Sequence, residues 1–294
     1  MIHAENVSKN FGENEVLKDL NLTIPDGSIF GLVGVNGAGK STLLRMIAGV
    51  YSCDEGEILL DGIDTFREPA VRRKIAFVSD EPYYPQRSTI RSYGNLYRSL
   101  YDFDEDAFAR YLKVFDLSDD MVINNLSKGM RRRCAILFAL SIHPKVLLLD
   151  EAYDGLEPIA RLHLKQILAD LVEDEDIIVV ISSHNLKELE DICDTYGILE
   201  DGKITMSGDL ITARENVNKY QVAFAEDKTK EDFDGLDVLR YKAEGRVIQL
   251  VIRGDRDAVT ESLRAMDPLI LDVLPVNFEE LFIYEVEKGG EDHE

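Results

Sequence analysis

The sequence predicts an α/β fold with a largely parallel sheet, and two observations support this prediction. First, apolar runs typical of strands alternate with segments of helical spacing, an order that places helices on both faces of a parallel sheet. Two such runs, 146–149 and 177–181, are continuously apolar, as is typical of strands buried on both faces. Second, a glycine-rich turn at 34–42 lies between an apolar run at 28–33 and a helical segment at 43–48.

The turn at 34–42 has the composition of a phosphate-binding loop. Glycines let the backbone approach phosphate oxygens, and a helix N-terminus directs unpaired N–H groups at an anion. Lys40 is expected to reach the outer phosphates, and the Ser41 hydroxyl to hold Mg²⁺. The stretch therefore predicts a P-loop and a nucleoside triphosphate site, formed by Gly34, Val35, Asn36, Gly37, Ala38, Gly39, Lys40, Ser41 and Thr42.

The segments before and after the P-loop predict an antiparallel edge beside the parallel sheet. Residues 2–24 are expected to form two strands around a turn at 12–14. A hairpin strand is expected at 57–62, and a short buried strand at 75–78.

A helical insert is predicted from about 85 to 145, because this region has helical spacing and no strand pattern. Its expected helices span 89–100, 105–115 and 128–142. The alternation then resumes with a strand at 145–150, a helix from about 159 to 172, a strand at 177–181, a helix at 186–192 and a hairpin at 196–206.

The pattern changes again near residue 218, so we divide the chain into two domains. Residues 1–217 are predicted to form the nucleotide-binding domain, and 218–294 a small accessory α+β domain. The expected elements of the second domain are strands at 220–224, 238–241 and 247–252, a helix near 256–266, a strand near 268–274 and a helix near 277–287. Its last residues, 289–294, predict a disordered acidic tail.

The composition narrows the class of partner. The formal net charge of −23 argues against non-specific binding to nucleic acid or to anionic lipid, which needs clustered Lys and Arg. The three cysteines are far apart and predict neither disulfides nor a zinc site, so a reducing compartment is expected. No signal peptide and no apolar run long enough to span a membrane are found, which predicts a cytoplasmic chain.

Two adjacent carboxylates, Asp150 and Glu151, follow the buried strand at 145–150. The carboxyl ends of strands in α/β sheets form the edge where ligands bind. Asp150 is a candidate for holding Mg²⁺, and Glu151 is a candidate for polarising an attacking water.

Two further motifs narrow the prediction: a signature segment, Leu126–Met130, and Ser182-Ser183-His184 at the end of the next strand. With these motifs in this order, residues 1–215 resemble the nucleotide-binding subunits of ATP-binding cassette (ABC) transporters. The resemblance implies a P-loop NTPase (ABC ATPase) core, ATP and Mg²⁺ as cofactors, and ATP hydrolysis. It also implies separate transmembrane permease subunits, which would hold the chain at the inner face of the cell membrane.

The resemblance also implies roles for single residues. Phe11 would stack on the adenine ring, although it could instead be a packed core aromatic. Glu151 would be the general base, and His184 would contact the γ-phosphate, in a catalytic set of Glu151, His184, Lys40 and Asp80. Ser127 and Gly129 would face ATP held by a second chain, which implies a homodimer or a heterodimer with a similar ATPase. A crossing loop, Asp154–Glu157, would run between the two subunits.

The chain departs from the commonest family pattern at three places. Lys128 and Met130 replace Gly and Gln of the signature, a form that resembles the drug- and antibiotic-exporter subgroup. Asp80 stands where Gln is usual, and it could still contact Mg²⁺ or the water. In the crossing loop, Asp154 and Glu157 replace Ser and Asp.

Two clusters have open interpretations. Tyr93, Tyr97 and Tyr101 follow helical spacing, either as the core of the insert or as part of a groove that receives a helix of a membrane subunit. The run 131–133 consists of three arginines at the start of a helix, which we expect to be solvated or paired.

The resemblance thus implies an ATP-hydrolysing subunit of an ABC transporter, an exporter by its signature form, which powers separate membrane subunits through ATP-driven dimer closure. One alternative is a non-transport ABC ATPase acting on ribosomes or DNA, but such proteins usually have tandem cassettes or a long coiled-coil insert, and this chain shows one P-loop and no long heptad run. Another alternative is a low-turnover ATP-sensing module, which the substitutions Asp80 and Met130 favour.

Overall fold

The computed structural model describes residues 1–276 and Glu280. The chain divides into two compact units, Met1–Ser207 and a second that begins at Gly208. The predicted domain boundary at 217/218 stays a prediction. No helix of the described residues is long and apolar enough to cross a membrane.

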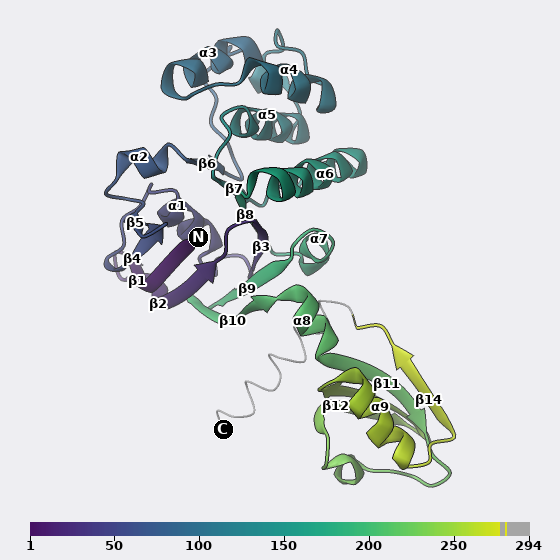
Figure 1. Cartoon of the computed structure of the whole chain (residues 1–294). Helices are drawn as coiled ribbons and strands as arrows, with labels where there is room; N and C mark the ends of the chain where they lie inside the picture. Colours follow the sequence, from purple (N-terminus) through teal and green to yellow (C-terminus); the bar gives the residue numbers. More distant parts are fainter. Residues whose placement is uncertain (277–279, 281–294) are drawn as a thin grey trace. The chain divides into compact units, whose positions relative to one another are not determined.

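A six-stranded sheet forms the centre of the first unit, in the order β10-β9-β3-β8-β7-β6 (Figure 1). The pairs β3/β8, β3/β9, β7/β8 and β6/β7 are parallel, as predicted. The turn between β9 and β10 has positive φ at both Asp201 and Gly202, as a two-residue hairpin requires. The strands are β3 (Ser28–Val33), β6 (Ile75–Val78), β7 (Val146–Asp150), β8 (Ile178–Ser183), β9 (Thr195–Glu200) and β10 (Lys203–Asp209).

The predicted antiparallel edge is a separate four-stranded sheet in the order β2-β1-β4-β5. All of its strand pairs are antiparallel. The strands are β1 (Ile2–Phe11), β2 (Asn14–Ile24), β4 (Glu55–Leu60) and β5 (Ile63–Asp64).

Helices cover both faces of the six-stranded sheet, which Figure 1 shows with α1 on one side and α6 and α7 on the other. The alternation of side chains along β3 explains this arrangement. Phe30 and Leu32 join the core that contains Leu43 of α1, whereas the position of Gly31 faces Cys193 and the α7 side chain Leu189. The helices are α1 (Lys40–Ile47), α6 (Pro158–Glu175) and α7 (Leu186–Glu190).

The insert contains the three predicted helices, α3 (Ile90–Leu100), α4 (Glu105–Val114) and α5 (Lys128–Leu140). Capping residues fix where they begin: Thr89, Asp104 and Ser127 each accept a hydrogen bond from a backbone N–H of the first turn. The fully buried Phe138 packs against an aromatic cluster of Tyr93, Tyr97 and Phe108. The tyrosine stripe is therefore core of the insert, at least along this side of α3.

The second unit has a four-stranded antiparallel sheet in the order β12-β13-β11-β14. Tyr220, Leu250 and Leu263 belong to its own hydrophobic core. Its strands are β11 (Val217–Ala223), β12 (Asp237–Glu244), β13 (Val247–Arg253) and β14 (Ile270–Leu274), and its helices are α8 (Leu210–Glu215) and α9 (Arg256–Ala265). The helix predicted near 277–287 and the acidic tail lie outside the described residues, apart from Glu280.

Candidate active site

The parallel strands β3, β6, β7 and β8 bring the predicted motifs to one edge of the sheet. The glycine-rich loop joins β3 to α1, while Asp80, Glu151 and His184 follow the other three strands. A pocket of ≈ 380 Å³ opens at this edge, lined by Val16, Asn36, Gly37, Gly39, Lys40, Ser41, Thr42, Asp80 and Glu151. The edge is therefore where a ligand is expected in an α/β sheet.

The loop keeps its shape through close backbone approaches. A Cβ at Gly34 would lie 2.5 Å from the carbonyl oxygen of Leu199 in β9. Gly39 has φ = 111° and is the N-cap of α1, which has no side-chain cap and no acidic residue in its first turn. The first N–H groups of α1 are thus left for an anion.

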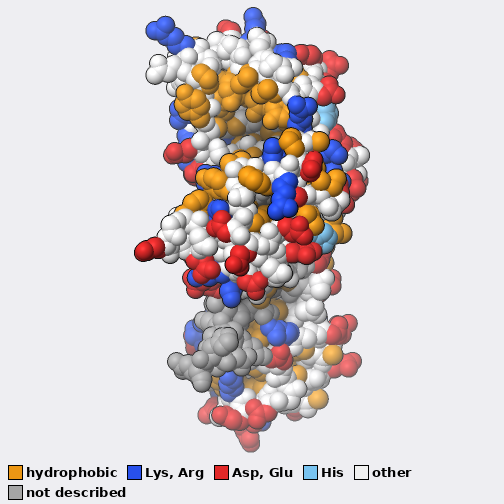
Figure 2. Space-filling view, turned by 90° about the vertical axis from the view of Figure 1, so that its left-hand side faces the viewer, with side chains coloured by type: hydrophobic (Ala, Val, Ile, Leu, Met, Phe, Trp, Pro, Cys, Tyr) orange, Lys and Arg blue, Asp and Glu red, His pale blue; other side chains and the backbone are white. Residues whose placement is uncertain are grey.

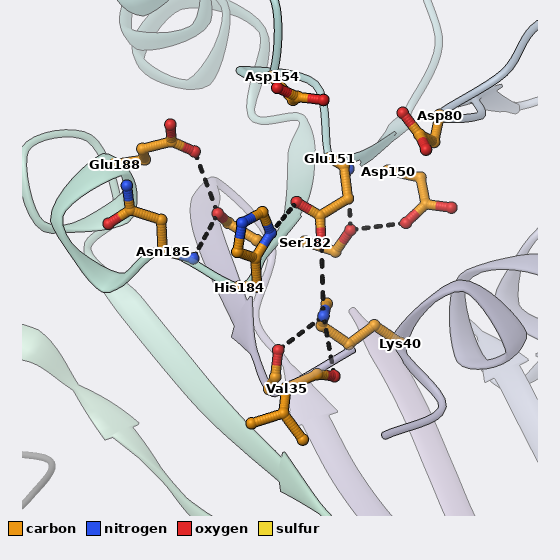
Figure 3. Close-up of polar contacts among 12 residues, drawn as sticks. Val35, Lys40, Asp80, Asp150, Glu151, Asp154, Ser182, His184, Asn185 and Glu188 are labelled. Atoms are coloured by element: carbon orange, nitrogen blue, oxygen red, sulfur yellow. Dashed lines mark hydrogen bonds and ion pairs between the residues drawn. The ribbon is translucent and has the colours of Figure 1, made fainter. Parts of the chain in front are cut away.

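Lys40 is buried against its own loop, with 5% of its side chain exposed. Its Nζ donates to the carbonyl oxygens of Gly34 at 2.6 Å and Val35 at 3.3 Å. The same Nζ lies 3.4 Å from Oε1 of Glu151 (Figure 3). The predicted phosphate-binding cation and the predicted general base are therefore in direct contact.

The two carboxylate oxygens of Asp150 differ in their hydrogen bonding. The hydroxyls of Ser41 and Ser182 both donate to Oδ1, at 3.0 and 2.7 Å. Oδ2 is buried and has no hydrogen-bond partner within the part of the chain that the structure describes. A carboxylate oxygen beside a hydroxyl fits Mg²⁺, which proteins usually bind through one or two carboxylates together with phosphates and waters. Among those same residues, no group of three or more His, Cys, Asp and Glu side chains forms a metal site of its own.

Glu151 is held by its neighbours in an unusual backbone conformation. Its φ is 49°, in the left-handed region, at a cost of about 1–3 kcal/mol that the surroundings must offset. Its N–H donates to the carbonyl and the hydroxyl of Ser182, and its Oε2 lies 2.9 Å from Nδ1 of His184 (Figure 3). Strand β8 thus fixes the backbone of Glu151, and His184, the residue after the strand, holds its side chain. Ser182 is a site residue to which the sequence analysis assigned no role.

Arg132 of α5 is another site residue that the sequence analysis missed. Its side chain is 1% exposed, although the run 131–133 was expected only to be solvated or paired. One guanidinium nitrogen donates to the carbonyls of Asp150 and Glu151, and another to the carbonyl and Oδ1 of Asp80. One feature of the sequence could have indicated this role. Arg132 lies four residues after Lys128, so both cations lie on one face of α5.

Lys128 connects the signature segment to the crossing loop. Its Nζ lies 2.6 Å from Asp154 and 3.8 Å from Asp80. The hydrogen bond between Lys128 and Asp154 raises the pKa of the ammonium and lowers the pKa of the carboxyl. The departures from the family pattern at 80, 128 and 154 therefore form one charged network (Figure 3 shows the two aspartates).

The structure does not bring Ser127 and Gly129 into the pocket of their own chain, because neither lines it. Ser127 is exposed and accepts a hydrogen bond from the backbone N–H of Met130. A Cβ at Gly129 would lie 2.4 Å from the carbonyl oxygen of Gly155, so the signature segment packs tightly on the crossing loop.

Phe11 is also absent from the pocket lining, and its side chain is 45% exposed. The Phe11 ring packs edge-on against the Tyr51 ring, with 5.5 Å between the two ring centroids. Nζ of Lys9 lies 5.6 Å from the centroid of the Phe11 ring. The interpretation of Phe11 as a packed core aromatic is therefore wrong, because nearly half of the side chain is open to solvent. Its role in stacking stays a prediction.

Comparison with known proteins identifies relatives of this chain. A family model described as ABC transporter matches residues 17–154. The ABC transporter ATP-binding protein YtrB of Bacillus subtilis (strain 168) is 32% identical over 289 residues, which cover 96% of this chain and 97% of YtrB. The lantibiotic transport ATP-binding protein SrtF of Streptococcus pyogenes is 32% identical over 210 residues, 70% of this chain and 90% of SrtF.

A solved structure is similar as well. It is described as the dimeric structure of a post-hydrolysis state of the ATP-binding cassette MJ0796 bound to ADP and Pi. It has a TM-score of 0.62 and 26% sequence identity, and the match covers 71% of this chain and 99% of that chain.

Proposed function

The chain belongs to the ATP-binding subunits of ABC transporters, and from this premise we propose that it powers export through separate membrane subunits by closing as a dimer on MgATP. The observation that carries the proposal is the contact of Lys40, Glu151 and His184 beside the half-satisfied carboxylate of Asp150. This arrangement supports phosphoryl transfer to water.

We propose the following roles for the site residues. Ser41 and Asp150 would hold Mg²⁺, which would neutralise charge on the phosphate oxygens. When ATP binds, the ammonium of Lys40 would leave the carboxylate of Glu151 and contact the phosphates instead. Its Nζ is only 3.4 Å from Oε1 of Glu151 and lies against the loop that would bind the phosphates. Glu151, freed from Lys40, would accept a proton from the attacking water while His184 holds its other oxygen.

A second chain would complete the site. The first turn of α5 follows the exposed N-cap Ser127, which lies outside the pocket of its own chain. Backbone N–H groups at the start of a helix can bind an anion. We propose that this turn faces the γ-phosphate of ATP held by a second copy or a similar ATPase. The dimeric state of the MJ0796 cassette supports this arrangement.

A membrane subunit would dock at a groove of the first unit. The groove has a volume of ≈ 430 Å³ and is lined by Ala48, Gly49, Val50, Arg72, Ile75, Ala76, Phe77, Tyr97, Tyr101, Ala139 and Ile142. Figure 2 shows hydrophobic side chains gathered over the insert on the face that carries α3. We propose that a helix of the permease fits here, at the inner face of the membrane, so that α3 serves both as core of the insert and as docking wall.

The direction of transport is proposed from the signature segment. Its form, with Lys128 and Met130, resembles that of drug and antibiotic exporters. The relative SrtF, named for lantibiotic transport, supports a substrate of that class.

The variant Glu151→Gln tests the proposal. Removing the general base should lower MgATP hydrolysis by about 10²–10⁴-fold, because a positioned base typically supplies that factor. Binding should persist, so MgATP should convert the purified variant from monomer to dimer in size-exclusion chromatography with light scattering. Glu173→Gln, the same change at an exposed position of α6, is the matched control and should behave as wild type.

Two results would contradict parts of the proposal. A Glu151→Gln variant that stays monomeric in saturating MgATP would exclude dimer closure. Wild-type protein without magnesium-dependent hydrolysis, even with its membrane subunit present, would favour the ATP-sensing module instead.

A further inference from the structure

The buried cation Arg132 has no assigned role in the reaction, yet it contacts three of the site residues. It lies on α5 of the insert, and it donates four hydrogen bonds of 2.6–2.9 Å to two loops at the catalytic edge. Three acceptors are main-chain carbonyls, and the fourth is the carboxylate of Asp80. The guanidinium therefore ties the Asp80 loop to the backbone that carries Asp150 and Glu151.

Burial makes the partner of this cation important. A charged group that is 99% withdrawn from water is costly unless an opposite charge and hydrogen bonds compensate it. Within the described residues, the ion pair recorded for Arg132 is the one with Asp80 at 2.6 Å. The planar guanidinium suits the site, because its fixed fork of donors can serve two loops at once.

Asp80 needs Arg132 for a reciprocal reason. Asp80 lines the same pocket as Lys40 and Glu151, and its side chain is 44% exposed. An uncompensated carboxylate there would repel both Glu151 and a bound triphosphate. The cation at 2.6 Å offsets that charge and holds Oδ1 in a hydrogen bond.

We propose that Arg132 is a positioning residue for ATP hydrolysis, which makes an acidic residue workable at position 80 and fixes the main chain of Glu151. The proposal deepens the function given above, since it assumes that the pocket lined by Asp80 holds the γ-phosphate. Asp80 and Arg132 then act as a matched pair, so changing both should do less harm than changing Arg132 alone.

A double-mutant cycle tests this pairing. The variants are Arg132→Gln, Asp80→Gln and the double variant, each assayed for kcat and KM with MgATP. Arg132→Gln should lower kcat at least about tenfold and raise KM, because it leaves Asp80 with only the more distant Lys128, at 3.8 Å, as a compensating cation. The double variant should recover at least about fivefold of the lost kcat and restore KM, because it removes the carboxylate of Asp80 together with its nearest cation.

A second measurement does not depend on activity. Urea unfolding of the four proteins without nucleotide should show that the combined loss of stability is smaller than the sum of the two single losses. Arg131→Gln removes the same charge from the neighbouring position of α5. The backbone carbonyl of Arg131 accepts a hydrogen bond from the hydroxyl of Tyr84, which the substitution leaves in place, so this variant should match wild type in both assays.

The outcomes distinguish a failure of the role proposed for Arg132 from a failure of the proposed function. Additive effects in both the kinetic and the unfolding cycle, or an equal loss in Arg131→Gln, would overturn the role of Arg132. If Arg132→Gln does not fold, Arg132→Lys replaces it and should retain the pairing with Asp80 while losing part of kcat. A wild-type protein that hydrolyses no MgATP would instead count against the proposed function, and the unfolding cycle would still report on the pair.

Discussion

At the scale of single residues, Gly34 shows how a missing side chain fixes the phosphate-binding loop. The position lies where β3 ends, and a Cβ there would come within 2.5 Å of the Leu199 carbonyl oxygen in β9. That oxygen belongs to the backbone of an interior strand, so it cannot move as a flexible side chain could. The loop can follow its path only because position 34 is glycine.

We expect Gly34→Ala to lower the free energy of unfolding by about 1–3 kcal/mol, the usual cost of overpacking a core. ATP affinity should fall as well, because the loop carbonyl that holds Lys40 would shift. Gly94→Ala in α3 is the comparison. Its Cβ would come close only to the flexible end of the Arg98 side chain, at 3.0 Å, with Phe138 at an ordinary contact distance of 3.7 Å, and alanine favours a helix. Equal losses for the two variants in urea unfolding would contradict the argument.

Most site residues were predictable from the sequence because each lies in a motif that the local pattern reveals. Lys40 and Ser41 follow a glycine turn, and Asp150 and Glu151 end a buried strand that is parallel to β8. Arg132 was not predictable in the same way. Among three consecutive arginines, only tertiary packing decides which one is buried, and the carboxylate that compensates it is 52 residues away.

At the scale of elements, His143 joins the insert to the core of the first unit. It follows α5, and its Nε2 lies 2.8 Å from Asp104, the N-cap of α4. Its Nδ1 lies 3.5 Å from Glu175, the last residue of α6. The hydrogen bond with Asp104 raises the pKa of His143 most, and the hydrogen bond and charge of Glu175 add to the effect, while partial burial opposes it.

This contact predicts a pH dependence of stability. Because the folded-state pKa of His143 is raised, its contribution is fully present below the unfolded pKa of about 6.5 and is lost as pH rises through the folded pKa. His143→Asn should therefore lower the free energy of unfolding at pH 6 by up to about 1 kcal/mol, since the site is partly exposed. Above the folded pKa the two proteins should converge.

Urea unfolding at pH 6 and pH 9 measures the difference. Asparagine is the suitable replacement because position 143 has φ = 43°, which asparagine tolerates. A difference that grows with pH would show that the charged imidazole does not stabilise the contact.

The long elements were predictable, whereas three of the short ones were not. Helices α3, α4 and α5 end within about two residues of their predicted limits, because each has several turns of apolar spacing. The helices α2 (Pro69–Arg72) and α8 and the strand β5 are too short to show a period. The order of strands in the six-stranded sheet also depends on pairings between distant segments, which no local pattern specifies.

At the scale of the whole molecule, the proposed interaction with a membrane subunit relies on a surface of the first unit alone. The chain as a whole has a net charge of −23, so a partner helix with basic residues would be attracted to it. The groove itself combines apolar lining with Arg72 and the half-buried tyrosines Tyr97 and Tyr101. Shape and apolar contact are thus expected to set its specificity.

Tyr101→Glu should abolish co-purification of a membrane protein with the tagged chain in detergent. A carboxylate at this position would be buried without a partner in the docked state. Hydrolysis by the isolated chain should stay within about twofold of wild type, because Tyr101 does not line the nucleotide pocket. Ser99→Glu places the same charge on α3 outside the groove and should leave co-purification intact, and a loss in both variants would contradict docking in the groove.

The buried pair of Arg132 and Asp80 has a consequence for the history of such sequences. A lineage that acquired aspartate at position 80 before arginine at 132, or the reverse, would pass through a chain with one charge unpaired at its catalytic edge. Selection would then favour the two exchanges close together in time, and reversal of either would be resisted once both were present. Among related chains, an acidic residue at position 80 should therefore occur together with a basic residue at position 132.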